Sequence, residues 1–204
     1  DLDIFLLNHT GTKLFGFNRE NTGEDPMEIL QFIVTGNTIA NILITRDTAN
    51  SNVRFKYIVF RGDITINEHN AGTSTLVGQA NSKGAMAVGA VLYSNTPAFG
   101  VDPPTIASFS SGGGTMVENE MRQKPDFTAP NGVNTTVNFN HLNIDNDSLP
   151  NFFGTSSAVP HAGGVAALML EGSKKYWNTE LIPDSVREIL RLTALEMDSA
   201  DYNP

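Results

Sequence analysis

The chain has 204 residues, carries a formal net charge of −9 and contains no cysteine. A chain of this length can bury one good core or one and a half, and a hydrophobic share of 40% is ordinary for a globular protein. The acidic balance argues against nucleic acid and anionic membrane surfaces as partners, and no apolar run is long enough to span a bilayer. The lack of cysteine excludes a disulfide framework and a thiolate metal site.

Residues 1 to about 65 show the pattern of short strands. Turn residues separate β-branched or aromatic runs at 1–8, 13–18, 29–34, 38–45 and 53–60. Strands at this spacing are typical of an antiparallel sandwich or jelly roll. We therefore expect an all-β accessory domain over residues 1–71.

Carboxylates cluster along the first part of this domain. Asp1, Asp3 and Asp25 are candidate calcium ligands, with Glu24 and Glu28 close to them in the sequence, because hard cations prefer several oxygen ligands. The alternative is a solvated strand edge and turn. If calcium binds there, we expect it to be a structural ion. We expect no cofactor to be required.

The character of the chain changes after residue 71. Residues 72–84 resemble a loop, whereas A-M-A-V-G-A-V-L-Y at 85–93 is a continuous apolar run that ends at turn residues. Such a run predicts a buried strand of a parallel sheet. We expect residues 72–204 to form an α/β domain, with its last helix near residues 184–195 and with Val186, Ile189, Leu190 and Thr193 facing inward.

The segment from Phe152 to Leu170 predicts a tight turn followed by a buried helix. Its apolar and small residues recur at helical spacing on one face, made of Val159, Ala162, Gly163, Ala166, Ala167 and Leu170. We expect Thr155 to cap this helix and Ser156 to lie in its first turn, where backbone amides lack acceptors and the helix dipole is positive. Pro160 is expected to remove an intrahelical hydrogen bond and to bend the first turn.

G-T-S-S-A-V-P-H at residues 154–161 resembles the serine motif of the subtilisin-like proteases, the subtilases. Three further segments resemble that family in the order it uses: the apolar strand at 85–91, A-S-F-S-S-G at 107–112 and K-P-D-F-T-A-P at 124–130. Asn131 replaces the glycine that usually follows A-P, which we explain by the tolerance of asparagine for left-handed backbone angles.

The resemblance implies roles for particular residues. Ser156 is the expected nucleophile, and its backbone N–H is an expected donor to the oxyanion. Gly154 and Thr155 are expected to contact substrate, and Gly78, Gln79 and Ala80 to form part of a substrate-pocket wall. His161, on the helix that follows the serine, is implied to be structural rather than the catalytic base.

The chain lacks the other residues that subtilase catalysis needs. The family supplies an aspartate, a histidine in H-G-T and an oxyanion asparagine in A-G-N before the serine, and none of these settings occurs here. We therefore expect the chain to be the nucleophile-bearing part of a larger, extracellular or cell-surface endopeptidase that cleaves protein or peptide substrates. The missing N-terminal half of the catalytic domain is then its partner, and the isolated chain is expected to be inactive.

Two other interpretations stay open. A sedolisin-type peptidase shares the fold and a G-T-S motif but uses glutamate and aspartate partners. Alternatively, the protein is a non-catalytic, subtilase-like scaffold whose β-domain binds a surface ligand, because a fold does not determine a function.

Overall fold

The computed structural model describes residues 1–46, 52–60, 64–70, 72–138 and 142–197. The chain divides into two compact units, Asp1–Phe55 and Lys56–Pro204. This division falls earlier than the boundary expected after residue 71. The reason is that the Lys56 ammonium donates hydrogen bonds to the Leu76 carbonyl at 2.6 Å and to the Thr115 hydroxyl at 3.1 Å, both in the second unit. In the described part of the chain, neither helix combines the length and the apolar character that crossing a bilayer requires.

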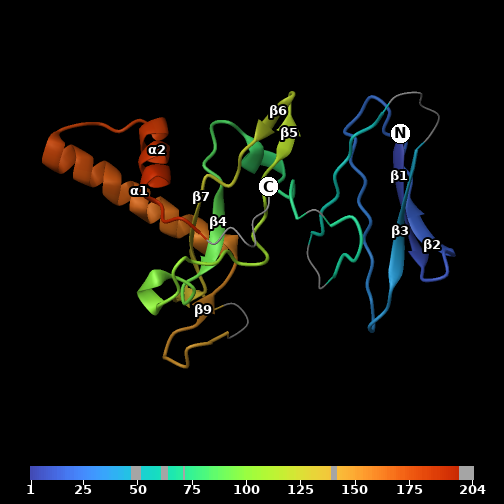
Figure 1. Ribbon diagram of the computed structural model, residues 1–204, viewed down its shortest axis with the longest axis horizontal. Helices are drawn as coiled ribbons and strands as arrows, with labels where there is room; N and C mark the ends of the chain where they lie inside the picture. The colour runs from blue at the N-terminus through green and yellow to red at the C-terminus, as the bar shows by residue number, and fades with distance from the viewer. Residues whose placement is uncertain (47–51, 61–63, 71, 139–141, 198–204) are drawn as a thin grey trace. The chain divides into compact units, whose positions relative to one another are not determined.

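The first unit contains an antiparallel sheet of three strands. These are β1 (Leu2–Asn8), β2 (Lys13–Phe17) and β3 (Ala40–Arg46), in the order β2-β1-β3 (Figure 1). The central strand contributes the buried side chains Phe5 and Leu6. Three of the expected strands are therefore confirmed.

The other two expected strands are wrong, because residues 29–34 and 53–60 form no strand. Their apolar side chains stay in solvent: Ile33 is 91% exposed and Phe60 is 76% exposed. A run of β-forming residues becomes a strand only where a neighbour satisfies its backbone groups. Within the described residues of 1–71 there is one sheet, so a β-sandwich is not confirmed.

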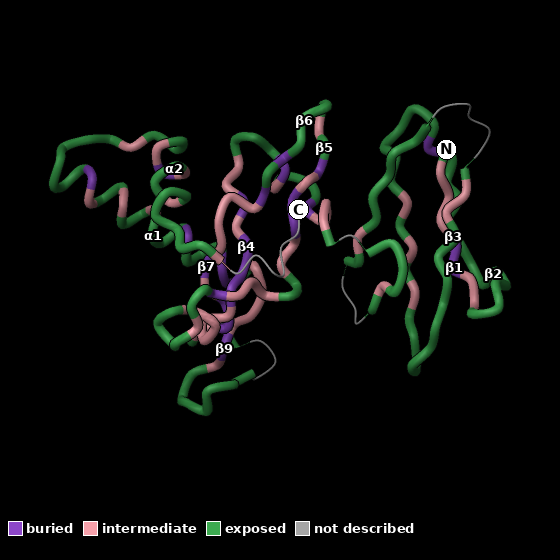
Figure 2. Tube along the Cα trace, viewed as in Figure 1, coloured by how far each residue is buried: buried purple, intermediate pink, exposed green. Residues whose placement is uncertain are grey.

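The second unit is built on a pair of parallel strands covered by a helix. β4 (Val88–Leu92) pairs in parallel with β7 (Phe127–Asn131), and α1 (Thr155–Trp177) packs against both strands. Their shared core is small: the buried residues are Ala90, Ala129, Ala158 and Ala162. Buried positions gather on β4 and β7 (Figure 2). Four methyl groups let the helix lie close to the sheet. The parallel strands and the helix on them are compatible with the expected α/β class.

Shorter elements surround this pair of strands. Two antiparallel ladders join β5 (Thr115–Val117) to β6 (Glu120–Arg122), and β8 (Val133–Asn134) to β9 (Asn151–Phe152). The 3₁₀ turns are η1 (Gly78–Asn81) and η2 (Pro97–Phe99), and the last helix is α2 (Pro183–Thr193). In α2, Val186 is buried as expected, but Ile189 and Thr193 are exposed.

The burial of α1 differs from the expected pattern. Its buried residues are Ser157, Ala158, Ala162 and Ser173, whereas Val159, Gly163, Ala167 and Leu170 of the expected inward face are exposed. The face that meets the sheet is centred on Ala158 and Ala162, which lie one helical turn apart. Helical periodicity reports apolar positions, and here several of those positions face solvent.

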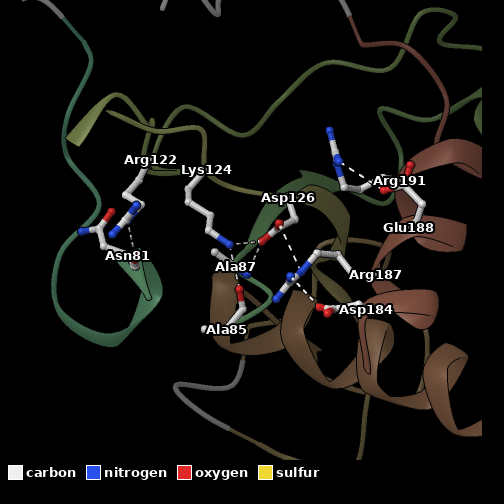
Figure 3. Close-up of polar contacts among 10 residues, drawn as sticks. All are labelled: Asn81, Ala85, Ala87, Arg122, Lys124, Asp126, Asp184, Arg187, Glu188 and Arg191. Atoms are coloured by element: carbon white, nitrogen blue, oxygen red, sulfur yellow. Dashed lines mark hydrogen bonds and ion pairs between the residues drawn. The ribbon is translucent and has the colours of Figure 1, made fainter. Parts of the chain in front are cut away.

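A buried ion pair just before β7 links this strand to the segment before β4 and to α2 (Figure 3). The Lys124 ammonium lies 2.7 Å from the Asp126 carboxylate, and the side chains are 7% and 8% exposed. The same carboxylate accepts the Ala87 amide at 2.8 Å, while Lys124 also donates to the Ala85 carbonyl at 2.7 Å. Arg187 of α2 lies 3.7 Å from the second carboxylate oxygen. The pair thus fixes the start of β7 to the segment that leads into β4.

We predict that Asp126→Ala lowers the free energy of unfolding by about 3–5 kcal/mol, because it leaves the buried Lys124 ammonium without its counter-ion. Asp184→Ala is the matched control. Asp184 also pairs with Arg187, at 3.1 Å, but its side chain is 80% exposed, so its loss should cost about 1 kcal/mol or less. Urea unfolding of the two variants checks this, and equal midpoints would contradict it.

A second prediction concerns Glu28 in the first unit. Asn21 donates to its Oε1 at 2.8 Å, and its Oε2 is buried with no hydrogen-bond partner in the described part of the chain. Burial, and then the charge of Asp3, raise the pKa of Glu28 above its usual value. The fold thus favours the protonated carboxyl. This preference stabilises the fold below the ordinary glutamate pKa and is lost as pH rises through the raised pKa.

Glu28→Gln should therefore raise the melting temperature at neutral pH and give no gain near pH 4, since glutamine keeps the acceptor for Asn21 without the charge. Thermal unfolding followed by circular dichroism at both pH values measures the effect. Glu24→Gln, at an exposed residue paired with Arg19, is the control and should give no gain. A pH-independent difference for Glu28→Gln would show that its charge is not the cause.

Candidate active site

Ser156 lies exposed in the first turn of α1. The chain leaves β9 and passes through Gly154, whose φ of 102° and ψ of 170° suit glycine, and the helix begins at Thr155. Gly154 is the N-cap and no side chain caps the helix, so the expected cap by Thr155 is wrong. Ser156 remains exposed, while the next two residues are 2% and 0% exposed. The turn thus presents one hydroxyl outward and anchors the residues behind it.

The backbone around Ser156 suits the stabilisation of negative charge. The Gly154 carbonyl accepts the amides of Ser157 at 2.9 Å and Ala158 at 3.3 Å. The amides of Thr155 and Ser156 come earlier in the first turn, where a helix offers no acceptor and its dipole is positive. Pro160 lies within α1 and has no amide, so it gives the Ser156 carbonyl no intrahelical hydrogen bond.

Hydrogen bonds from the end of β7 and the residue after it hold the segment that leads into this turn. The Gly132 amide donates to the Phe152 carbonyl at 2.9 Å, and the Gly154 amide donates to the Asn131 side-chain oxygen at 3.4 Å. Gly132 has a φ of +75°, and a Cβ there would lie 2.6 Å from the Leu92 side chain. Asn131, in contrast, is not among the positive-φ residues. Backbone tolerance therefore does not explain Asn131, and our sequence-based reason for it was wrong.

Asn151 ties the polar loop at 142–150 to the strand pair β8 and β9. Its amide nitrogen donates to the Gly132 carbonyl at 3.0 Å, to Asn134 at 2.8 Å and to Asp145 at 3.2 Å. Its side-chain oxygen accepts the Ile144 amide at 2.7 Å. The sequence reasoning missed Asn131 and Asn151. The only signal for Asn131 was its departure from the serine-protease pattern.

Three of the four histidines lie within the described residues. His161 Nδ1 lies 2.8 Å from the Ser157 carbonyl, which can only accept, so Nδ1 carries the proton. His9 lies in an exposed turn of the first unit, His69 in a turn with a φ of 60°, and His141 outside the described residues. Across the ranges that the structure describes, no imidazole is hydrogen-bonded to the Ser156 hydroxyl. The serine is thus presented without an activating base from this part of the chain.

The expected pocket-wall residues Gly78, Gln79 and Ala80 form η1. Hydrogen bonds tie η1 to its own surroundings. Asn81 donates to the Leu76 carbonyl at 2.9 Å, and Arg122 of β6 donates to the Asn81 carbonyl at 3.2 Å (Figure 3). Contact of this turn with substrate stays a prediction.

The carboxylates proposed as calcium ligands lie in the first unit. Within the described ranges, no group of three or more acidic, histidine or cysteine residues is placed to hold a metal ion. Asp3 acts electrostatically on Glu28, while the backbone carbonyl of Asp25 accepts the Met27 amide at 2.8 Å. Calcium binding by Asp1, Asp3 and Asp25 stays a prediction.

Comparison with known families agrees with this geometry. The model of the subtilase family matches residues 25–203, so the match begins inside the first unit and runs through the second. No significant match was found among curated proteins or solved structures. Since the matched region covers most of the chain and contains the exposed serine at the start of α1, the chain belongs to the subtilase family.

Proposed function

We propose that this chain carries the nucleophile of a subtilisin-like serine endopeptidase, and that the nucleophile is Ser156. The observation that carries the proposal is the exposure of Ser156 in the first turn of α1, directly after a glycine turn, in a chain that belongs to a family of serine peptidases. A hydroxyl at a helix start lies beside amides that can stabilise an anion.

The chemistry follows from this arrangement. The Ser156 Oγ forms a bond to the carbonyl carbon of the scissile peptide while its proton passes to a base, and the carbonyl oxygen becomes an oxyanion. The Ser156 N–H donates to that oxyanion. The tetrahedral intermediate collapses with release of the protonated amine, and water then hydrolyses the acyl-enzyme by the same steps. The base, its carboxylate partner and the second oxyanion donor are not supplied by the residues described around Ser156.

We further propose that those groups lie upstream of Asp1, in the remainder of the same catalytic domain. The exposed surface of α1 supports this. Its solvent side carries the large apolar residues Val159, Val165, Leu168, Leu170, Tyr176 and Trp177. A helix apolar on several sides belongs to a domain interior, and parallel strands are normally covered on both faces. The rest of the catalytic domain is the partner whose apolar surface would cover them.

The same proposal gives roles to other parts of the chain. Gly154 and Thr155 border the nucleophile, and Gly78, Gln79 and Ala80 are proposed to line a wall for the peptide substrate by their position in the family pattern. We propose that the enzyme acts outside the cell or on its surface, as the family resemblance implies.

The first test uses the full-length protein that contains this chain. A fluorophosphonate probe should label Ser156 in the wild type, and Ser156→Ala should abolish labelling. Ser157→Ala is the matched control. Its hydroxyl is buried with no hydrogen-bond partner in the described part of the chain, so its removal should leave labelling unchanged and stability equal or higher. A folded wild type that is not labelled would favour the non-catalytic scaffold.

A second test uses the isolated chain of residues 1–204. Without an activating base the serine hydroxyl is a weak nucleophile, so labelling should be slower by a factor of at least about 10⁴ than in the full-length protein. Gel fluorescence against time gives both rates. Enzyme-like labelling of the isolated chain would contradict this prediction, because the base would then have to come from residues 1–204.

A further inference from the structure

Asn131 is a fully buried amide at the carboxyl end of β7, with 0% exposure. Its backbone carbonyl accepts the Tyr93 amide at 2.9 Å, which continues the pairing with β4. Its side chain points out of the strand ladder, and the side-chain oxygen accepts the Gly154 amide at 3.4 Å. One residue thus links the parallel strands to the turn that precedes Ser156.

The hydrogen bond with Gly154 determines which end of the Asn131 side-chain amide faces the turn. A backbone amide can only donate, so the Asn131 oxygen faces Gly154 and the amide nitrogen faces the other way. That nitrogen is buried and has no hydrogen-bond partner in the described part of the chain. A buried, unpaired donor costs about 1–3 kcal/mol, which an apolar residue of the same volume would avoid. The stability of the fold therefore does not account for an asparagine at this position.

The contact that Asn131 makes is close to the proposed chemistry. Gly154 has a φ of 102°, and the direction of the chain there sets where the amide and hydroxyl of Ser156, two residues later, are placed. A misplacement of about 1 Å in a reacting group can lower a rate by about 100-fold. A hydrogen bond to the Gly154 amide restrains this peptide group.

We propose that Asn131 is a positioning residue, whose side-chain oxygen holds the Gly154 amide and so fixes the turn that presents Ser156. The inference rests on the proposed function of Ser156 as nucleophile. It predicts that the oxygen of residue 131 matters for the reaction rate, whereas its amide nitrogen does not.

Asn151 offers a matched control on the same strand pair. It is 1% exposed and makes several hydrogen bonds, to Gly132, Asn134, Asp145 and Ile144, but none of them goes to Gly154. Asn151→Leu should therefore lower stability without changing the turn in the same way.

The experiment compares Asn131→Leu, Asn131→Asp and Asn151→Leu in the full-length protein, with kcat and KM for a peptide substrate. Asn131→Leu should lower kcat by about 10- to 100-fold and change KM by less than about 3-fold. Asn131→Asp keeps the acceptor near the positive end of α1 and should retain kcat within about 5-fold. Asn151→Leu should keep kcat within about 3-fold at temperatures where it is folded.

A second readout does not depend on activity. In the full-length protein, hydrogen exchange at the Gly154 amide should become at least about 10-fold faster in Asn131→Leu than in Asn151→Leu. Should Asn131→Leu fail to fold, Asn131→Ala makes the same comparisons.

Each result decides the inference. It is overturned if folded Asn131→Leu keeps the wild-type kcat, if Asn131→Asp loses as much as Asn131→Leu, or if Asn151→Leu loses equally. Unchanged exchange at Gly154 would overturn the contact itself. An inactive wild type would instead overturn the proposed function, and the catalytic role of Asn131 with it.

Discussion

The close approach of α1 to the pair β4 and β7 is the constraint on which the second unit depends. Four alanines form the buried centre of the contact, with Val88, Ala107 and Phe127 packed against them, so methyl groups set the distance between helix and sheet there. The helix that starts at Thr155 therefore has little freedom to shift toward or away from the strands. The position of Ser156 depends on this contact, because the buried residues directly after it belong to the face that meets the sheet.

Buried polar side chains hold the two ends of β7, in addition to the alanine contacts along the strand. At the start of β7 the Lys124 and Asp126 pair fixes the strand to the segment before β4, and at its end the Asn131 side chain accepts the Gly154 amide, just before Ser156. The strand is thus held at both ends by buried side chains that cost free energy to desolvate. Well-packed apolar residues of similar size at such positions are often neutral or stabilising.

The sequence predicted the second unit better than the first. The apolar run at 85–93 contains β4, and the serine motif and the pattern after Pro183 gave the two helices, because short local signals decided each of them. The runs at 29–34 and 53–60 have the same β-forming character as β1, yet they form no strand, since strand formation depends on partners that a local pattern does not reveal. The inward face of α1 was misjudged for a related reason: periodicity finds Val159 and Leu170, but the sheet meets Ala158 and Ala162. Asn131 could be seen as unusual, but its contact with Gly154 arises between residues 23 positions apart and needed the fold.

Pro160 has a consequence for the peptide group of Ser156. In an ordinary helix the carbonyl of the second residue accepts a hydrogen bond from the amide four residues later. Here that later residue is Pro160, which has no amide hydrogen. The Ser156 carbonyl is therefore released from the helical ladder, while the residues after Pro160 remain in it. The one carbonyl that Pro160 leaves without a helical donor thus belongs to the residue that we propose as the nucleophile.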